Sequence, residues 1–181
     1  MTLSNFDLKE LATKLRLGKV DIIMQDQLSN FEIDVENGKY IINLGKMSDP
    51  RTRGGTHWVG LQCRNKGECV YFDSFGMPMP KDIEAFAKSD KRIKKIGYNR
   101  KIIQALESSL CGWHTLAFLT YNSRSTKESL LESANDFTNV YSTDVDFNAG
   151  RIRELINHWI PTNFPKRLFD LLMEKICIPK L

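Results

Sequence analysis

Apolar residues recur at helical spacing near both ends of the chain and crowd into short runs between them. Helical spacing places hydrophobic side chains on one face, as in helices that pack on a core. It predicts four amphipathic helices, over residues 5–17, 126–137, 148–160 and 165–176. Ser4 or Asn5 is expected to cap the first helix and Gly18 to end it, while Ser125 or Thr126 is expected to cap the second.

Short runs rich in β-branched and aromatic residues occupy the middle of the chain. Residues 57–63 and 69–73 flank a Gly-containing turn at 65–67, which predicts a β-hairpin. In that hairpin His57 begins one strand and Asp73 ends its neighbour. Antiparallel pairing would therefore bring the two side chains to the same end of the sheet.

Three further segments of the middle region have recognisable patterns: a strand over 39–44, a short helix over 81–87, and one or two strands over 93–103. The pattern of residues 20–31 leaves a strand and an extended loop equally open. Strands in the middle with helices at both ends predict a single α+β domain spanning residues 1–181.

The stretch from Leu110 to Tyr121 is apolar almost all round, which indicates a helix buried inside the core. Cys111 falls in its first turn. There the unpaired backbone N–H groups and the helix dipole favour the thiolate, the nucleophilic form of cysteine. The alternative is an ordinary buried cysteine, so the assignment depends on whether partners for a nucleophile exist elsewhere.

Composition places the chain among globular proteins, with 41% hydrophobic and 27% charged residues. No apolar run approaches the roughly 20 residues of a membrane span, and residues 1–10 lack the core of a signal peptide. We therefore expect no membrane association and a protein kept inside a cell or packaged there. Cys63 and Cys69 could pair across the hairpin, but a reducing compartment favours free thiols, and the cysteine spacing predicts no structural metal.

Basic residues are concentrated in one segment although the net charge is only +4. The segment could attract phosphate groups, which makes DNA a candidate partner, or it could be an ordinary solvated loop. Its basic residues are Lys91, Arg92, Lys94, Lys95, Arg100 and Lys101.

A cysteine protease needs a thiolate, an imidazole, a group that orients the imidazole, and donors for the oxyanion. The sequence offers Cys111, His57 and Asp73 for the first three roles. Gln104, which lies seven residues before Cys111, offers an amide donor, and the backbone N–H of Cys111 could be the second donor. Each residue alone has an ordinary structural explanation, and only their combination points to catalysis.

Three motifs in this order resemble the adenovirus maturation protease and the wider group that contains the SUMO-specific proteases. They are Gly54-Gly-Thr-His-Trp58, Tyr71-Phe-Asp-Ser-Phe-Gly76, and Gln104 followed by Cys111-Gly112. The opening Asp7-Leu-Lys-Glu-Leu and the later Leu17-Gly18 are also similar to the adenovirus enzyme. Papain-type enzymes have the cysteine before the histidine, which separates this chain from them.

The resemblance implies a papain-like α+β fold in which helices flank a central mixed sheet and the nucleophile begins a buried helix. It also implies a triad of His57, Asp73 and Cys111 with Gln104 as oxyanion donor. Trp58 and Gly112 would line a narrow substrate channel suited to glycine, although Trp58 could equally be a core residue. Aspartate is the acid of the SUMO-specific enzymes, whereas many adenovirus enzymes carry glutamate.

The expected function is therefore a cysteine endopeptidase that cleaves viral capsid precursor proteins at Gly-Gly-X or Gly-X-Gly sites during virion maturation. We expect a monomer in the virion or the host cell interior, with DNA as a candidate activator and no cofactor. No cysteine lies between Asp73 and Cys111, where the adenovirus enzyme attaches its peptide activator. The alternatives are a protease that removes ubiquitin-like modifiers and a non-catalytic module that binds nucleic acid or capsid.

Overall fold

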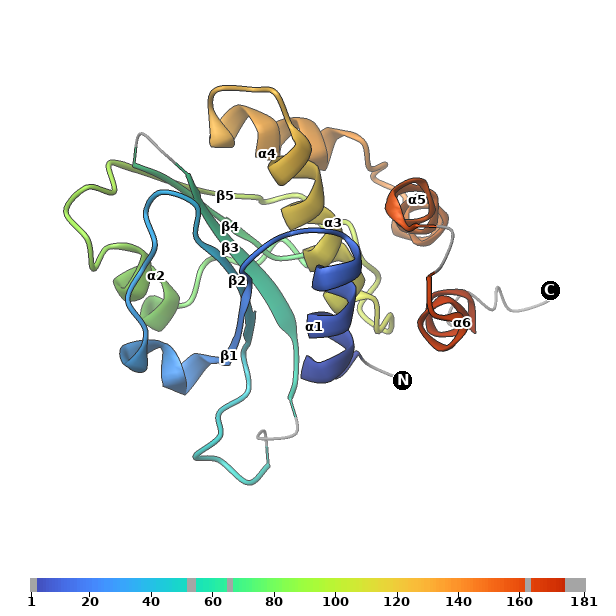
Figure 1. The fold of residues 1–181 in the computed structure, drawn as a ribbon, viewed down its shortest axis with the longest axis horizontal. Coiled ribbons are helices and arrows are strands. Elements are labelled where there is room, and N and C mark those ends of the chain that lie inside the picture. Colours follow the sequence, from blue (N-terminus) through green and yellow to red (C-terminus); the bar gives the residue numbers. More distant parts are fainter. Residues whose placement is uncertain (1–2, 52–54, 65–66, 162–163, 175–181) are drawn as a thin grey trace.

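A five-stranded sheet runs through the middle of the computed structural model, which describes residues 3–51, 55–64, 67–161 and 164–174 (Figure 1). The strands lie in the order of the sequence: β1 (Asp21–Met24), β2 (Lys39–Asn43), β3 (Trp58–Arg64), β4 (Glu68–Phe72) and β5 (Lys95–Tyr98). Strands β2, β3 and β4 are antiparallel, whereas β1 and β5 pair in parallel with β2 and β4. The sheet is therefore mixed, as expected.

Helices cover both faces of this sheet (Figure 1). Helices α1, α3 and α4 lie on one face with α5 and α6 outside them, and the 3₁₀ helix η1 lies with α2 on the other. Their bounds are α1 Asn5–Lys14, η1 Gln25–Asn30, α2 Lys81–Ala87, α3 Cys111–Arg124, α4 Leu130–Asn139, α5 Val145–Trp159 and α6 Lys166–Glu174. The α+β prediction is confirmed, and residues 20–31 form both a strand and a short helix.

Helix α3 lies directly against β3. The hydroxyl of Thr115 donates to the carbonyl of Trp58 (3.2 Å). A Cβ atom at Gly60 would lie 3.3 Å from both Thr115 and Phe118, so the missing side chain lets helix and strand approach closely. Most of α3 is buried, as its sequence predicts.

Strand β3 and helix α3 are also joined at their C-terminal ends, away from Trp58 and Cys111. The guanidinium of Arg64 donates to the carbonyl of Asn122 and, at 2.9 Å, to that of Lys127. The buried carboxylate of Glu68 accepts a hydrogen bond from the backbone N–H of Leu130 (2.7 Å) at the start of α4. The far end of the hairpin thereby holds the turn between α3 and α4.

Several helix ends differ from the predictions; helix α5, for example, begins at Val145, three residues before its predicted start. Ser4 caps α1 through a capping box with Asp7, but the helix ends at Lys14 and not at the predicted Leu17, because Arg16 adopts a left-handed φ of 58°. Helix α4 begins at Leu130, later than predicted. Its cap is Ser129, whose side chain accepts from the N–H of Glu132, and neither Ser125 nor Thr126 has that role.

The expectation of free thiols was wrong for one pair of cysteines. Cys63 and Cys69 occupy directly opposed positions of β3 and β4 and form a disulfide. Opposed residues of antiparallel strands lie close together, so the hairpin register itself brings the two sulfur atoms into reach. Cys111 is a buried free thiol.

Parts of several predictions lie outside the described residues: Gly54 of the first motif, residues 65 and 66 of the hairpin turn, Ile176 of the last predicted helix, and Cys177. Within the described part of the chain, none of the helices has the length and hydrophobicity needed to cross a membrane.

Candidate active site

His57 and Asp73 meet at one edge of the sheet, where β3 begins and β4 ends. The imidazole Nε2 of His57 lies 2.8 Å from Oδ1 of Asp73. Asp73 directly follows β4 and His57 directly precedes β3, so their side chains converge without a special loop. This is the arrangement that the hairpin prediction implied.

Asp73 is held in a network that keeps its carboxylate buried and oriented. Its Oδ1 also accepts from the backbone N–H of Phe75 (2.8 Å), and its Oδ2 accepts from the hydroxyl of Tyr71 (3.4 Å). Burial and the neighbouring carboxylate raise the pKa of Tyr71, so the phenol remains a donor. The ring of Phe75 stacks on His57 with 4.5 Å between centroids, which restricts the imidazole further.

The pKa of His57 is raised from 6.5 to about 9. Burial opposes the charged imidazolium, but the hydrogen bond to Asp73, the nearby Cys111 side chain and the charges of both groups outweigh it. His57 is therefore positively charged at neutral pH. Because Nε2 faces Asp73, Nδ1 is the ring nitrogen that remains for a second partner.

Cys111 is the first residue of α3, as the sequence predicts, and Leu110 is its N-cap residue. The first turn of a helix presents N–H groups without intrahelical partners, and these stabilise negative charge nearby. The side chain of Cys111 lies close enough to His57 to contribute to the raised imidazole pKa. The site thus combines a buried thiol, a helix N-terminus and a protonated imidazole.

Gln104 is buried in the loop that leads to α3 and is fixed at both ends of its amide. Its Oε1 accepts from the hydroxyl of Ser74 (2.7 Å), and its Nε2 donates to the carbonyl of Ser108 (2.6 Å). The carbonyl of Ser74 accepts from the N–H groups of Ile103 and Gln104. An amide nitrogen carries two hydrogens, so a second donor remains on Nε2.

The two predicted substrate-binding residues are largely covered by the N-terminal segment. Trp58 is 6% exposed, and its indole N–H donates to the carbonyl of Leu3 (2.9 Å). A Cβ atom at Gly112 would lie 3.2 Å from Leu3 and 3.3 Å from Leu8, so this glycine packs against α1. Both residues have clear packing roles here.

A cavity of about 460 Å³ nevertheless lies beside Trp58. The N-terminal segment, β1, and the loop between β2 and β3 form its walls. Its lining includes Leu3, Ile22, Met24, Met47, Thr56 and Trp58. Because Thr56 precedes His57, the cavity is next to the candidate catalytic histidine.

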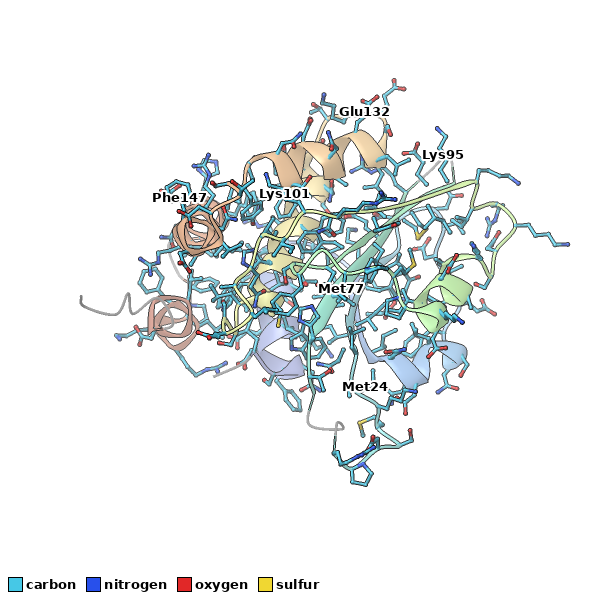
Figure 2. All side chains as sticks on the ribbon, turned by 180° about the vertical axis from the view of Figure 1, so that it is seen from behind. Met24, Met77, Lys95, Lys101, Glu132 and Phe147 are labelled. Carbon is cyan, nitrogen blue, oxygen red and sulfur yellow. A yellow bond between two sulfur atoms is a disulfide. The ribbon has the colours of Figure 1, made fainter. Side chains whose placement is uncertain are left out.

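Several side chains of the predicted basic patch bind separate partners within the protein. Lys95 pairs with Glu68 (3.3 Å), and Lys101 donates to the carbonyls of Thr138 and Tyr141. Figure 2 shows Lys95 and Lys101 well apart along the segment that contains β5.

Three other members of the predicted patch also have nearby partners. Arg92 pairs with Asp90 (2.7 Å), Lys94 donates to the carbonyl of Lys91, and Arg100 lies over the ring of Tyr98. The six basic residues therefore do not form one continuous surface of unengaged cations.

Some residues of the site were not predicted as functional. Ser74 and Phe75 lie inside the motif around Asp73, and the side chain of Asn99, just beyond β5, binds the backbone of Asp73. The available signal was only that Asn99 lies within the segment 93–103, for which one or two strands were predicted. No group of three or more potential metal ligands occurs among residues 3–51, 55–64, 67–161 and 164–174.

Comparison with known proteins gives a fold match and no sequence match. No protein-family model matches the chain, and no curated protein matches it either. The structure is similar to the ASFV pS273R protease, with a TM-score of 0.56 and 13% identity over 88% of this chain and 67% of that chain. A selenomethionine form of the ASFV protease gives a TM-score of 0.47 and 13% identity over 78% and 68% of the two chains. The chain therefore has the fold of the ASFV pS273R protease.

Proposed function

We propose that this protein is a cysteine endopeptidase with Cys111 as nucleophile, His57 as acid and base, and Asp73 as the orienting carboxylate. The observation that carries the proposal is the 2.8 Å contact between His57 and Asp73 beside a free cysteine at the start of α3. The shared fold with the ASFV pS273R protease supports the same assignment.

In the first half of the reaction, the Cys111 thiolate attacks the carbonyl carbon of the scissile peptide bond. The remaining Nε2 hydrogen of Gln104 and the backbone N–H of Cys111 stabilise the oxyanion that forms. His57, which is protonated at neutral pH, then donates its proton to the departing amine, and a thioester remains on Cys111.

In the second half, His57 is neutral and accepts a proton from water. The resulting hydroxide attacks the thioester, the carboxylic acid product leaves, and the Cys111 thiolate is restored beside a protonated His57. Asp73 keeps the imidazole in one orientation throughout and stabilises its charged form.

For the substrate, we propose viral capsid precursor proteins cleaved at Gly-Gly-X or Gly-X-Gly sites, inside the virion or the infected cell. The resemblance of the His57-Trp58 motif to the adenovirus maturation protease supports glycine beside the scissile bond. Removal of a ubiquitin-like modifier is the alternative, because modifiers of that kind also end in glycine. We propose a monomeric enzyme, and the engaged state of Lys95 and Lys101 weakens the case for DNA as activator.

The deciding experiment is intact-mass analysis after brief exposure to a peptide-glycine vinyl electrophile, with Cys111→Ala and His57→Ala as controls. We expect one label, absent in Cys111→Ala and slower in His57→Ala. No label in the presence or absence of DNA would favour the non-catalytic module. Cleavage of Gly-Gly-X peptides but not of modifier conjugates would then support the capsid-processing assignment over the alternative.

A further inference from the structure

Two asparagines lie at the same sheet edge as His57 and Asp73, one on each side of the hairpin. Asn43 is the last residue of β2, and Asn99 directly follows the last residue of β5. Strand β2 is antiparallel to β3 and β5 is parallel to β4, so the edge presents Asn43, His57, Asp73 and Asn99 in that order. The proposed catalytic pair is thus flanked by two amide side chains.

Asn43 holds the backbone that enters the catalytic histidine. Its Oδ1 accepts from the N–H of Thr56 (2.9 Å), the residue before His57, and from the N–H of Gly45 (2.8 Å). The N–H of Leu44 donates to the carbonyl of His57 itself (2.9 Å). Asn43 is 1% exposed, so its bonds are shielded from water, and the backbone is held at both Thr56 and His57.

Asn99 holds the backbone of the acid in the same way. Its Oδ1 accepts from the N–H of Asp73 (2.8 Å), and its Nδ2 donates to the carbonyl of the same residue (2.7 Å). The Nδ2 also donates to the carbonyl of Lys101 (3.2 Å). One side chain therefore satisfies both backbone groups of Asp73, and an amide is well suited because it carries a donor and an acceptor.

The asparagine side chains bind the backbone at the point where the regular strand pairing ends. The paired positions of β2 and β3 end at Asn43 and Trp58, and those of β3 and β4 end at Gly60 and Phe72. His57 and Asp73 lie one residue beyond their strands. Without the two asparagine side chains, the N–H groups of Thr56 and Asp73 would lose the partners that hold them.

We propose that Asn43 and Asn99 are positioning residues, which fix the His57–Asp73 pair by binding its backbone from the two neighbouring strands. The inference rests on the proposed protease function. Neither side chain is assigned a contact with substrate. Their effect would pass through Thr56 to the imidazole and through the Asp73 backbone to the carboxylate, where a misplacement of about 1 Å is enough to reduce turnover roughly 100-fold.

The test compares Asn43→Ala and Asn99→Ala with a matched control, Asn148→Ala. Asn148 makes the same pair of bonds to the backbone of Ser142, accepting from its N–H (2.8 Å) and donating to its carbonyl (3.0 Å). A further variant, Asn43→Asp, keeps an oxygen acceptor for Thr56 and Gly45. For each protein, kcat and KM on a Gly-Gly-X peptide, the His57 titration by imidazole NMR, and the urea midpoint are measured.

We expect Asn43→Ala and Asn99→Ala to lower kcat by roughly 10- to 100-fold with little change in KM, and to lower the pKa of His57 from about 9. Asn43→Asp should retain most of the turnover. Asn148→Ala should lower the urea midpoint while kcat and the His57 titration stay unchanged. If Asn99→Ala does not fold, Asn99→Gln displaces the same amide by one methylene and serves in its place.

The positioning role would be overturned if Asn43→Ala and Asn99→Ala both kept the wild-type kcat and His57 titration. It would also be overturned if Asn148→Ala lowered kcat and shifted the His57 titration as much as they do. Failure of the proposed function is a separate result: the wild-type protein would neither hydrolyse peptide nor take a label on Cys111. The His57 titration still decides the positioning role in that case, because it requires no turnover.

Discussion

The carbonyl oxygen of Leu3 accepts a hydrogen bond from the indole N–H of Trp58, 2.9 Å away. The segment before α1 thereby binds the residue that follows the proposed catalytic histidine. Leu3 also packs against Gly112, the residue that follows Cys111. Leu3 thus contacts the residue next to the candidate histidine and the residue next to the candidate nucleophile.

Replacement of Trp58 should show how much this contact contributes to stability. Trp58→Phe keeps an aromatic ring but removes the donor, so we expect a loss of about 1 kcal/mol in unfolding free energy. Trp58→Ala also leaves a cavity and should cost roughly 3–5 kcal/mol. Urea denaturation measures the unfolding free energy of both variants, and Trp159→Phe on the outer helix α5 is the control. Equal stability of Trp58→Phe and wild type would exclude a contribution from the hydrogen bond.

Asp73→Asn should move the alkaline limb of the pH–activity profile to lower pH. The carboxylate of Asp73 helps to raise the pKa of His57 to about 9, and His57 must be protonated to release the amine. Without that negative charge the imidazole loses its proton at a lower pH. The pH dependence of kcat/KM measures the shift. Asp49→Asn, which changes a half-buried carboxylate paired with Arg51, should leave the limb near pH 9.

The same titration should appear in protein stability. A folded-state pKa raised from 6.5 to about 9 means that the stabilisation is fully present below pH 6.5 and is lost as pH rises through about 9. The raised pKa corresponds to roughly 3 kcal/mol. Urea unfolding between pH 6 and pH 10 should show this decline in wild type and a smaller one in Asp73→Asn; parallel curves would contradict the coupling.

Gln104→Ala should reduce kcat by about 100- to 1,000-fold with a small change in KM, because an oxyanion donor acts mainly in the transition state. Ser74→Ala should have a weaker effect in the same direction, since Ser74 only orients the amide through its 2.7 Å bond. Steady-state kinetics measure both. The control is Gln25→Ala, which removes a glutamine side chain that is bonded to Asp82, away from the site. A change in KM without a change in kcat for Gln104→Ala would instead place Gln104 in substrate binding.

Reduction of the Cys63–Cys69 disulfide should lower stability without abolishing the reactivity of Cys111. The two cysteines are six residues apart, and closing so short a loop contributes about 2 kcal/mol in the chain-entropy model. The double variant Cys63→Ala/Cys69→Ala should therefore unfold at lower urea and still take one label. Loss of labelling in the folded variant would show that the disulfide also shapes the site.

Local patterns in the sequence were enough to predict the hairpin, and the hairpin was enough to predict that His57 and Asp73 meet. Helix α2 was predicted with the observed bounds, because its apolar positions and the preceding proline act over one turn. Cys111 at the start of α3 follows from the same local information, namely a loop followed by a continuously apolar segment.

Contacts between distant segments were not predictable in this way. The start of α4 depends on the carboxylate of Glu68, more than sixty residues earlier, which binds the N–H of Leu130. The cover over Trp58 depends on Leu3, and the position of Asp73 depends on Asn99. Such pairings follow from tertiary packing, for which a single sequence gives no periodic signal.

The joined ends of β3 and α3 impose a constraint on how this chain can vary. Seven strand residues span about 23 Å, and the fourteen residues of α3 span about 21 Å, so the two elements match in length. Arg64 ties them at one end, while the thiol and imidazole must meet at the other. An insertion or deletion within either element alone would separate nucleophile from base, so changes in chain length among related sequences should be confined to the loops.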